Sequence, residues 1–167
     1  MGIVNTTPDS FSDGGDHLDP AVAIDAAHRM LADGADIFVG GGESTRPHAE
    51  PVEAVEEIRR IEPVISALAD EGVVVSVDTS KADVATAALG AGASIVNDVT
   101  GLIDPDMRSA CARFGAGVVI MHMQGTPATM QDEPTYDDVV TDVGRFLAAQ
   151  SRAAIESGIP IESIAIA

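Results

Sequence analysis

Short, uninterrupted apolar runs recur along the chain and alternate with longer stretches of helical periodicity. The runs are rich in Val, Ile and Ala, and they lie at Met1–Val4, Ile37–Val39, Val73–Val77, Ala93–Val96, Gly117–Met121 and Ser163–Ala167. Because they lack the alternation of half-exposed strands, they are typical of parallel strands buried on both faces. The pattern therefore predicts six buried strands.

Five helices are predicted between these strands. Their apolar positions follow a helical spacing, and glycine follows several of them as a stop signal. They are expected at Pro20–Ala32, Val52–Ala69, Lys81–Leu89, Pro105–Phe114 and Tyr136–Glu156, the second with Glu and Arg on its outer face. Strands that alternate with helices indicate right-handed βαβ units and hence an α/β fold with a parallel sheet.

Two architectures fit this alternation, a doubly wound sheet and a TIM (β/α)8 barrel. A barrel uses roughly 31 residues per unit, so a chain of this length would hold five βα units and a sixth strand. Polar residues follow each of the first five strands, and in a barrel these strand ends converge on one mouth. We therefore predict a TIM barrel, with residues 1–167 as one domain that covers these units.

The charge of the chain limits its partners. Nine basic and 27 acidic residues give a net charge of -18, which repels nucleic acid and anionic membranes. An anionic substrate would have to be neutralised locally, by backbone donors, a few arginines or a divalent cation. The single Cys111 cannot form an intrachain disulfide and is expected in a helix. No run approaches the ~20 apolar residues of a membrane helix, and we expect a cytoplasmic protein.

Asp78 and Asn97 are the strongest candidate binding residues. Asp78 directly follows an apolar strand, where its carboxylate could accept two parallel hydrogen bonds from an amidine-like edge of a heterocycle. It could equally cap the helix that follows. Asn97 offers both a donor and an acceptor for the same heterocycle, or it forms a turn with Asp98. The residues alone leave these alternatives open.

Three other strand ends carry polar candidates. Asn5 could ligate Mg²⁺ while phosphate oxygens and water complete the shell, or it could serve a turn. Arg46 lies in a glycine-flanked loop and offers forked donors to phosphate or carboxylate, although a solvated arginine fits as well. His122 could act as an acid or base, but packing is the preferred interpretation, and Met121 is expected to line the core or a pocket.

Five segments together resemble the dihydropteroate synthase family of pterin-binding TIM barrels. They are MGIVNTTPDSFSDGG, GGESTRP, SVDTSKADVA, Ser94–Leu102 and VIMHMQGTPATMQ, and they occur in the family's order and spacing as far as about Gly158. The resemblance implies an enzyme that joins p-aminobenzoate to 6-hydroxymethyl-7,8-dihydropterin pyrophosphate. It also implies release of pyrophosphate and a requirement for Mg²⁺.

The resemblance also implies roles for individual residues. Asp78 and Asn97 would bind the pterin edge, and Met121 would form a wall of the pterin pocket. Asn5 would hold Mg²⁺ and pyrophosphate. The second loop would supply the substrate-binding residues Thr45, Arg46 and Pro47, and the catalytic residues would be Asp78, Asn97 and Arg46.

The chain departs from the family in three places. Val39, followed by Gly40, stands where the family usually has Asp, which we expect to loosen the second loop. His48 stands where the family favours Gly. The chain stops at Ala167, before the later strand-end segments of the family. Because an open arc of strands exposes two edges, we expect the isolated chain to be unstable, to need a partner or to form a homodimer.

Two other functions remain open at this point. The folate-binding domains of corrinoid methyltransferases share the pterin barrel, but the TPDSFSDGG and GGESTRP loops favour the synthase. A non-catalytic fragment that binds a pterin weakly or not at all is the second alternative, favoured by the early stop and by Val39.

Overall fold

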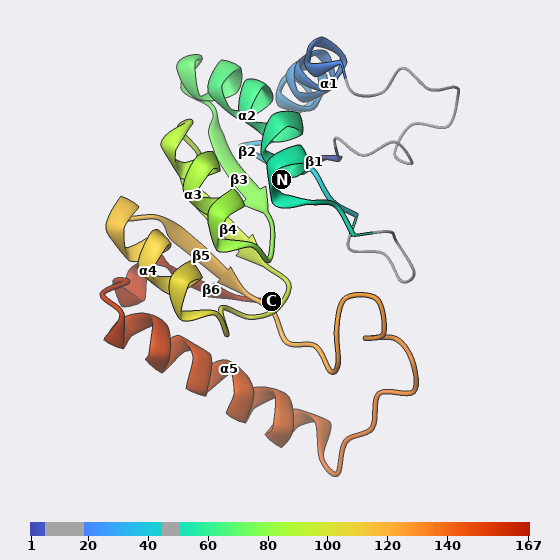
Figure 1. The fold of residues 1–167 in the computed structure, drawn as a ribbon, viewed down its shortest axis with the longest axis vertical. Helices are drawn as coiled ribbons and strands as arrows, with labels where there is room; N and C mark the ends of the chain where they lie inside the picture. The colour runs from blue at the N-terminus through green and yellow to red at the C-terminus, as the bar shows by residue number, and fades with distance from the viewer. Residues whose placement is uncertain (6–18, 45–50) are drawn as a thin grey trace.

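The computed structural model describes residues 1–5, 19–44 and 51–167, with only the backbone described at Asn5. Within these ranges strands and helices alternate from one end to the other (Figure 1). In chain order the elements are β1 (Gly2–Asn5), α1 (Pro20–Ala32), β2 (Ile37–Gly41), α2 (Ala54–Asp70), β3 (Val74–Asp78), α3 (Ala82–Gly90), β4 (Ile95–Asp98), α4 (Pro105–Phe114), β5 (Gly117–Ile120), α5 (Val139–Glu156), the 3-10 turn η1 (Ile161–Ser163) and β6 (Ile164–Ile166).

The six strands form one parallel sheet in the order β1-β2-β3-β4-β5-β6. Each strand pairs with the next one in the sequence, and successive helices pack beside one another along one side of the sheet (Figure 1). A doubly wound sheet reverses its strand order at a switch point, whereas a (β/α)8 barrel adds strands sequentially. The observed order is therefore that of successive barrel units, and the predicted fold class is confirmed.

The helix starts follow from their first residues. Asp19 caps α1 by accepting a hydrogen bond from the backbone N–H of Ala21 at 2.9 Å, and Asp104 caps α4 in the same way. In both helices proline follows the cap, where its missing N–H costs nothing. The bounds predicted for these two helices are correct. The fifth helix begins later than predicted, at Val139, because Asp138 caps it.

The first four strands extend further toward their carboxyl ends than the apolar runs indicate, whereas β5 and β6 end one residue earlier. Asp78 and Asn97 belong to strands β3 and β4, rather than following them, and Asn5 ends β1 as predicted. In register, Asn5 pairs with Gly41 and Asp78 pairs with Asn97. The polar ends of the strands therefore lie in one row across the sheet.

The main core lies between the sheet and its helices. Val75, Val77 and Val96 are fully buried there against residues such as Leu68 of α2, and a fully buried Val or Leu contributes about 1.5–3 kcal/mol. On the other face of the sheet, Ile3 is 63% exposed and Val74 is 41% exposed. Of the described helices, none has the length and apolar character required to cross a membrane.

Cys111 lies in this core on α4, where it is fully buried. Burial, assisted by the negative charge of Asp98, raises the pKa of its thiol to about 11. A thiol with so high a pKa is almost entirely protonated at neutral pH and is a poor nucleophile. The predicted role as a small apolar helix residue is confirmed.

Candidate functional site

Asp78 and Asn97 lie side by side at the ends of β3 and β4. Their Cα atoms are partners in the strand register, and the nearby side chain of Asn97 lowers the pKa of the Asp78 carboxyl group. The backbone N–H of Thr79 donates to the carbonyl of Asn97 at 3.1 Å. Helix α3 instead has Lys81 at its N-cap, without a side-chain cap. The interpretation of Asp78 as a helix cap is therefore wrong.

The carboxyl group of Asp78 can accept further hydrogen bonds from a ligand. Its Oδ1 atom is buried and has no hydrogen-bond partner among the described residues. Burial, followed by the negative charges of Asp98 and Glu57, raises the pKa of Asp78 to about 6, against a smaller lowering by Asn97. A buried, unpaired acceptor costs about 1–3 kcal/mol. A ligand that donates hydrogen bonds here would remove that cost.

Asp98 has a different role from its neighbour Asn97. It is fully buried, and its carboxylate accepts hydrogen bonds from Thr100 N at 2.8 Å, Thr100 Oγ1 at 2.7 Å and Leu102 N at 3.0 Å. Burial raises the pKa of Asp98, and these hydrogen bonds oppose that shift. The turn role considered for Asn97 therefore belongs to Asp98, because successive residues of a strand face opposite sides.

An ion cluster beside Asp78 was missed by the sequence analysis. The ammonium group of Lys81 lies 2.6 Å from Oε2 of Glu57 and also bonds to Glu43. Glu57 was expected on the outer face of its helix, but it is only 1% exposed. A signal was present in the sequence, because Glu57 shares the apolar stripe of Ile61 and Leu68 at helical spacing.

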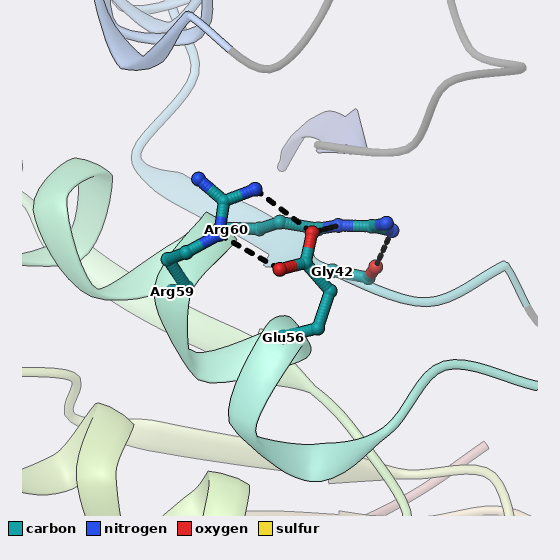
Figure 2. Close-up of polar contacts among 4 residues, drawn as sticks. All are labelled: Gly42, Glu56, Arg59 and Arg60. Atoms are coloured by element: carbon teal, nitrogen blue, oxygen red, sulfur yellow. Dashed lines mark hydrogen bonds and ion pairs between the residues drawn. The ribbon is translucent and has the colours of Figure 1, made fainter.

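The true outer face of α2 carries a second ion cluster (Figure 2). Glu56 accepts hydrogen bonds from Arg59 at 2.7 Å and from Arg60 at 2.9 Å. Arg60 also donates to the carbonyl oxygen of Gly42 at 3.0 Å. These hydrogen bonds lower the pKa of Glu56 to about 2. Arg60 thus links the outer face of the helix to the turn that follows β2.

The loop after β5 contributes a partly buried methionine and a packed histidine. Met121 directly follows β5 rather than ending it. The ring of His122 meets Phe146 edge-on at a centroid distance of 5.0 Å and lies 5.8 Å from Tyr136. Two aromatic neighbours favour packing over acid–base chemistry for His122, as the sequence indicated.

The ends of β2 and β3 and the loop after β5 converge on a common cavity. It is lined by Glu43, Ser44, Glu57, Asp78, Thr79, Ser80 and Pro127. Convergence of loops at the carboxyl ends of parallel strands is the usual position of a ligand site in this fold. The arrangement places the carboxyl group of Asp78 and the hydroxyl groups of Ser44, Thr79 and Ser80 around one cavity.

Some predicted site residues cannot be placed. Thr45, Arg46 and Pro47 lie outside the described residues, as does the side chain of Asn5, whose backbone ends β1. Within the described ranges, no group of three or more His, Cys, Asp or Glu side chains is arranged to hold a metal ion.

Val39, where the resemblance led us to expect an Asp, is buried in β2. It pairs in register with Ser76, whose buried hydroxyl has no hydrogen-bond partner among the described residues. The turn after β2 is nonetheless tied to α2 by Arg60. A looser second loop, the expected consequence of Val39 and Gly40, stays a prediction.

Comparison with known proteins places this geometry in a family. The family model described as "Pterin binding enzyme" matches residues 1–166. A probable bifunctional folylpolyglutamate synthase/dihydropteroate synthase of Haloferax volcanii is 51% identical over 99% of this chain and 20% of its own length. The dihydropteroate synthase of Escherichia coli is 46% identical over 98% of this chain and 58% of its own. The chain therefore spans about three fifths of the Escherichia coli relative.

Solved structures agree with this assignment. A Yersinia pestis dihydropteroate synthase in complex with a sulfonamide drug aligns with a TM-score of 0.92 at 46% identity, over 99% of this chain and 61% of that one. A Burkholderia cenocepacia dihydropteroate synthase complexed with 7,8-dihydropteroate aligns with a TM-score of 0.86 at 44% identity, over 99% of this chain and 56% of that one. Sequence, strand order and the site at the strand ends agree, and the chain belongs to the family of pterin binding enzymes.

Proposed function

We propose that the protein carrying this chain is a dihydropteroate synthase, a transferase of folate biosynthesis. It would join p-aminobenzoate to 6-hydroxymethyl-7,8-dihydropterin pyrophosphate and release pyrophosphate. The observation that carries the proposal is the register pairing of Asp78 with Asn97, together with a buried carboxylate oxygen of Asp78 that has no hydrogen-bond partner among the described residues. A relative at 44% identity is complexed with 7,8-dihydropteroate, which is the product of that reaction.

Asp78 and Asn97 would bind the pterin edge in this enzyme. The carboxylate of Asp78 would accept hydrogen bonds from the 2-amino group and the neighbouring ring N–H, with charge-assisted strength. Asn97, the register partner of Asp78, would offer its amide group to the same heterocycle. Met121 would form a wall of the pocket.

The second loop would supply the groups that meet the rest of the substrates. Thr45 would contact the pyrophosphate, and Arg46 and Pro47 would help to form the p-aminobenzoate site. The forked guanidinium of Arg46 suits phosphate and carboxylate oxygens, which is why we assign it a catalytic role with Asp78 and Asn97. Closed loops would exclude water while the amine of p-aminobenzoate attacks the pterin methylene carbon and pyrophosphate departs.

Asn5 is the residue that would hold Mg²⁺. An amide oxygen is a suitable hard ligand, and Mg²⁺ commonly takes one or two protein ligands while water and substrate phosphates complete its shell. Asn5 ends β1 and pairs with Gly41 in the row of polar strand ends, so its position fits such a ligand. The bound ion would stabilise the negative charge of the departing pyrophosphate.

We further propose that residues 1–167 form one pterin-binding domain, that the protein is a cytoplasmic homodimer and that its ligands are these small molecules. Val55 of α2 and Val140 of α5 are exposed apolar side chains on the helices, and burial of such surface between copies would be favourable. Light scattering on the purified protein tests this, and a monomer over the whole accessible concentration range would overturn the dimer.

Pterin affinity is expected to fall in acid. Because the pKa of Asp78 is raised to about 6, the carboxylate that accepts the pterin donors is present above that pH and is lost below it. We expect a nearly constant dissociation constant from about pH 7 to 8, and a roughly tenfold weakening per pH unit below about pH 6. Pterin fluorescence titrations would measure it. An affinity that is constant down to about pH 5 would contradict the assigned role of Asp78.

The proposed activity is tested by product formation. The protein is incubated with dihydropterin pyrophosphate, p-aminobenzoate and Mg²⁺, and dihydropteroate is measured by mass spectrometry. Product that disappears in the Asp78→Ala variant would support the proposal. Absence of product from the unaltered protein would refute the activity and would leave its membership of the family intact.

A further inference from the structure

Lys81 is the only lysine in a sequence with 27 acidic residues. It lies three residues after Asp78, at the start of α3, and it is 29% exposed. Its ammonium group bonds at once to Glu43, in the turn after β2, and to Glu57, on the buried stripe of α2. One side chain thus joins three segments that are distant in the sequence.

The pairing with Glu57 compensates a buried charge. Burial raises the pKa of Glu57, and the strongest opposing effect is the hydrogen bond from Lys81. Burial also tends to lower the pKa of Lys81, but its bonds to Glu43 and Glu57 leave that pKa raised overall. Each group therefore favours the charged form of the other, as buried ion pairs require.

The turn that contains Glu43 packs closely against helix α2. A Cβ atom on Gly42 would lie 2.9 Å from Cγ of Glu57 and 3.0 Å from Cγ2 of Ile61. The carbonyl of Gly42 accepts a hydrogen bond from Arg60 at 3.0 Å (Figure 2). The turn is held by close packing, by Arg60 and by Lys81 through Glu43.

The cluster is continuous with the candidate site. The hydroxyl of Thr79 accepts a hydrogen bond from the backbone N–H of Lys81 at 3.2 Å, and Thr79 also helps to lower the pKa of Glu57. Glu57 is close enough to raise the pKa of Asp78. Glu43, Glu57 and Asp78 line the same cavity.

We propose that Lys81 is a positioning residue of the candidate site, which fixes the ends of β2 and β3 relative to each other through Glu43 and Glu57. Its contribution to substrate binding rests on the proposed function, whereas its contribution to the geometry does not. Glu43→Gln separates the two, because it removes the charge at the turn and leaves the buried pair of Lys81 and Glu57 intact.

The test compares Glu43→Gln with Glu62→Gln, an exposed residue of α2. Amide hydrogen exchange at residues 41–44 should become about tenfold faster in Glu43→Gln, since a charged hydrogen bond is lost, and should not change in Glu62→Gln. The melting temperatures of both variants should stay close to that of the unaltered protein. Equal exchange in the two variants would overturn the proposal.

A second pair of variants keeps the test informative if a lone buried charge prevents folding. Lys81→Met combined with Glu57→Gln removes both buried charges, and Lys81→Arg retains the cation. The double variant should show the fast exchange of residues 41–44, and Lys81→Arg should restore slow exchange. If exchange at residues 41–44 is as fast in Lys81→Arg as in the double variant, a cation at position 81 does not position the turn.

Activity provides the last readout. In the synthase assay, Glu43→Gln should raise KM for dihydropterin pyrophosphate several-fold with a smaller effect on kcat, because the walls of the site are displaced. An unchanged KM in an active variant would overturn the contribution to binding. An inactive unaltered protein would instead refute the proposed function, and the exchange experiment would still decide the role of Lys81.

Discussion

Asp78→Asn is expected to stabilise the folded protein at neutral pH while it abolishes affinity for a pterin. The substitution retains the shape of the side chain and removes its charge. The pKa of Asp78 is raised from 3.8 to about 6, so the folded state binds its proton more tightly than the unfolded chain does. Stability from this group is therefore complete below about pH 4 and is lost as the pH rises through about 6.

The expected gain in the free energy of unfolding for Asp78→Asn is about 1–2 kcal/mol at about pH 8, and it should shrink toward zero near pH 4. Urea denaturation at both pH values measures it. Asp83→Asn, an exposed position in the first turn of α3, is the matched control and should change neither stability nor pterin affinity appreciably. A destabilised Asp78→Asn variant that binds pterin normally would contradict the account.

Such a result would identify Asp78 as a residue whose burial serves binding rather than folding. A charged group that is partly desolvated and unpaired costs stability in the free protein. The same group gains most when a ligand supplies the missing donors. Binding sites of proteins commonly contain groups that lower the stability of the free protein and are needed for its function.

Gly101→Ala is expected to destabilise the protein by about 3 kcal/mol or more, because two independent effects add. Gly101 has φ of 77°, a conformation that strains residues with a side chain. A Cβ atom there would lie 2.6 Å from the carbonyl oxygen of Met121 and 2.7 Å from the ring of Phe146. The backbone after β5 would have to move, and Met121 with it.

Gly144→Ala is the matched control for this substitution. Gly144 lies within α5, and a Cβ atom there would meet nothing within 4 Å. Alanine in a helix interior is about 0.5–1 kcal/mol more favourable than glycine, so this variant should be slightly more stable than the unaltered protein. Urea denaturation of both variants is the measurement. Equal stability of the two would show that the turn at Gly101 is not as constrained as its geometry indicates.

The sequence predicted the starts of helices well where neighbouring residues determine them. Asp19 and Asp104 each precede a proline, and these pairs fix the first residues of α1 and α4. The strand ends were less predictable. Asp78 and Asn97 belong to strands because they pair with a neighbouring strand, and that pairing depends on residues distant in the sequence.

In the candidate site, too, some features could be predicted from the sequence, and those that depend on distant residues could not. That Asp78 and Asn97 lie together could be predicted from their places at successive strand ends, whereas the local pattern left the helix-cap alternative for Asp78 open. The burial of Glu57 was indicated only by its place on the apolar stripe of its helix, whereas its ion pair with Lys81, which follows 24 residues later, could not be predicted from the local pattern. The order of the strands, which distinguishes a barrel from a doubly wound sheet, was indicated only by the polar residues at the strand ends.

The most direct test of the central claim is the titration of the Asp78 carboxyl group itself. Its ¹³C resonance would be followed by NMR as a function of pH, with and without a saturating pterin. The account predicts an apparent pKa of about 6 in the free protein and a clear decrease when the pterin N–H groups donate to the carboxylate. A bound pterin that leaves this titration unchanged would show that the ligand does not meet Asp78 and would contradict the account.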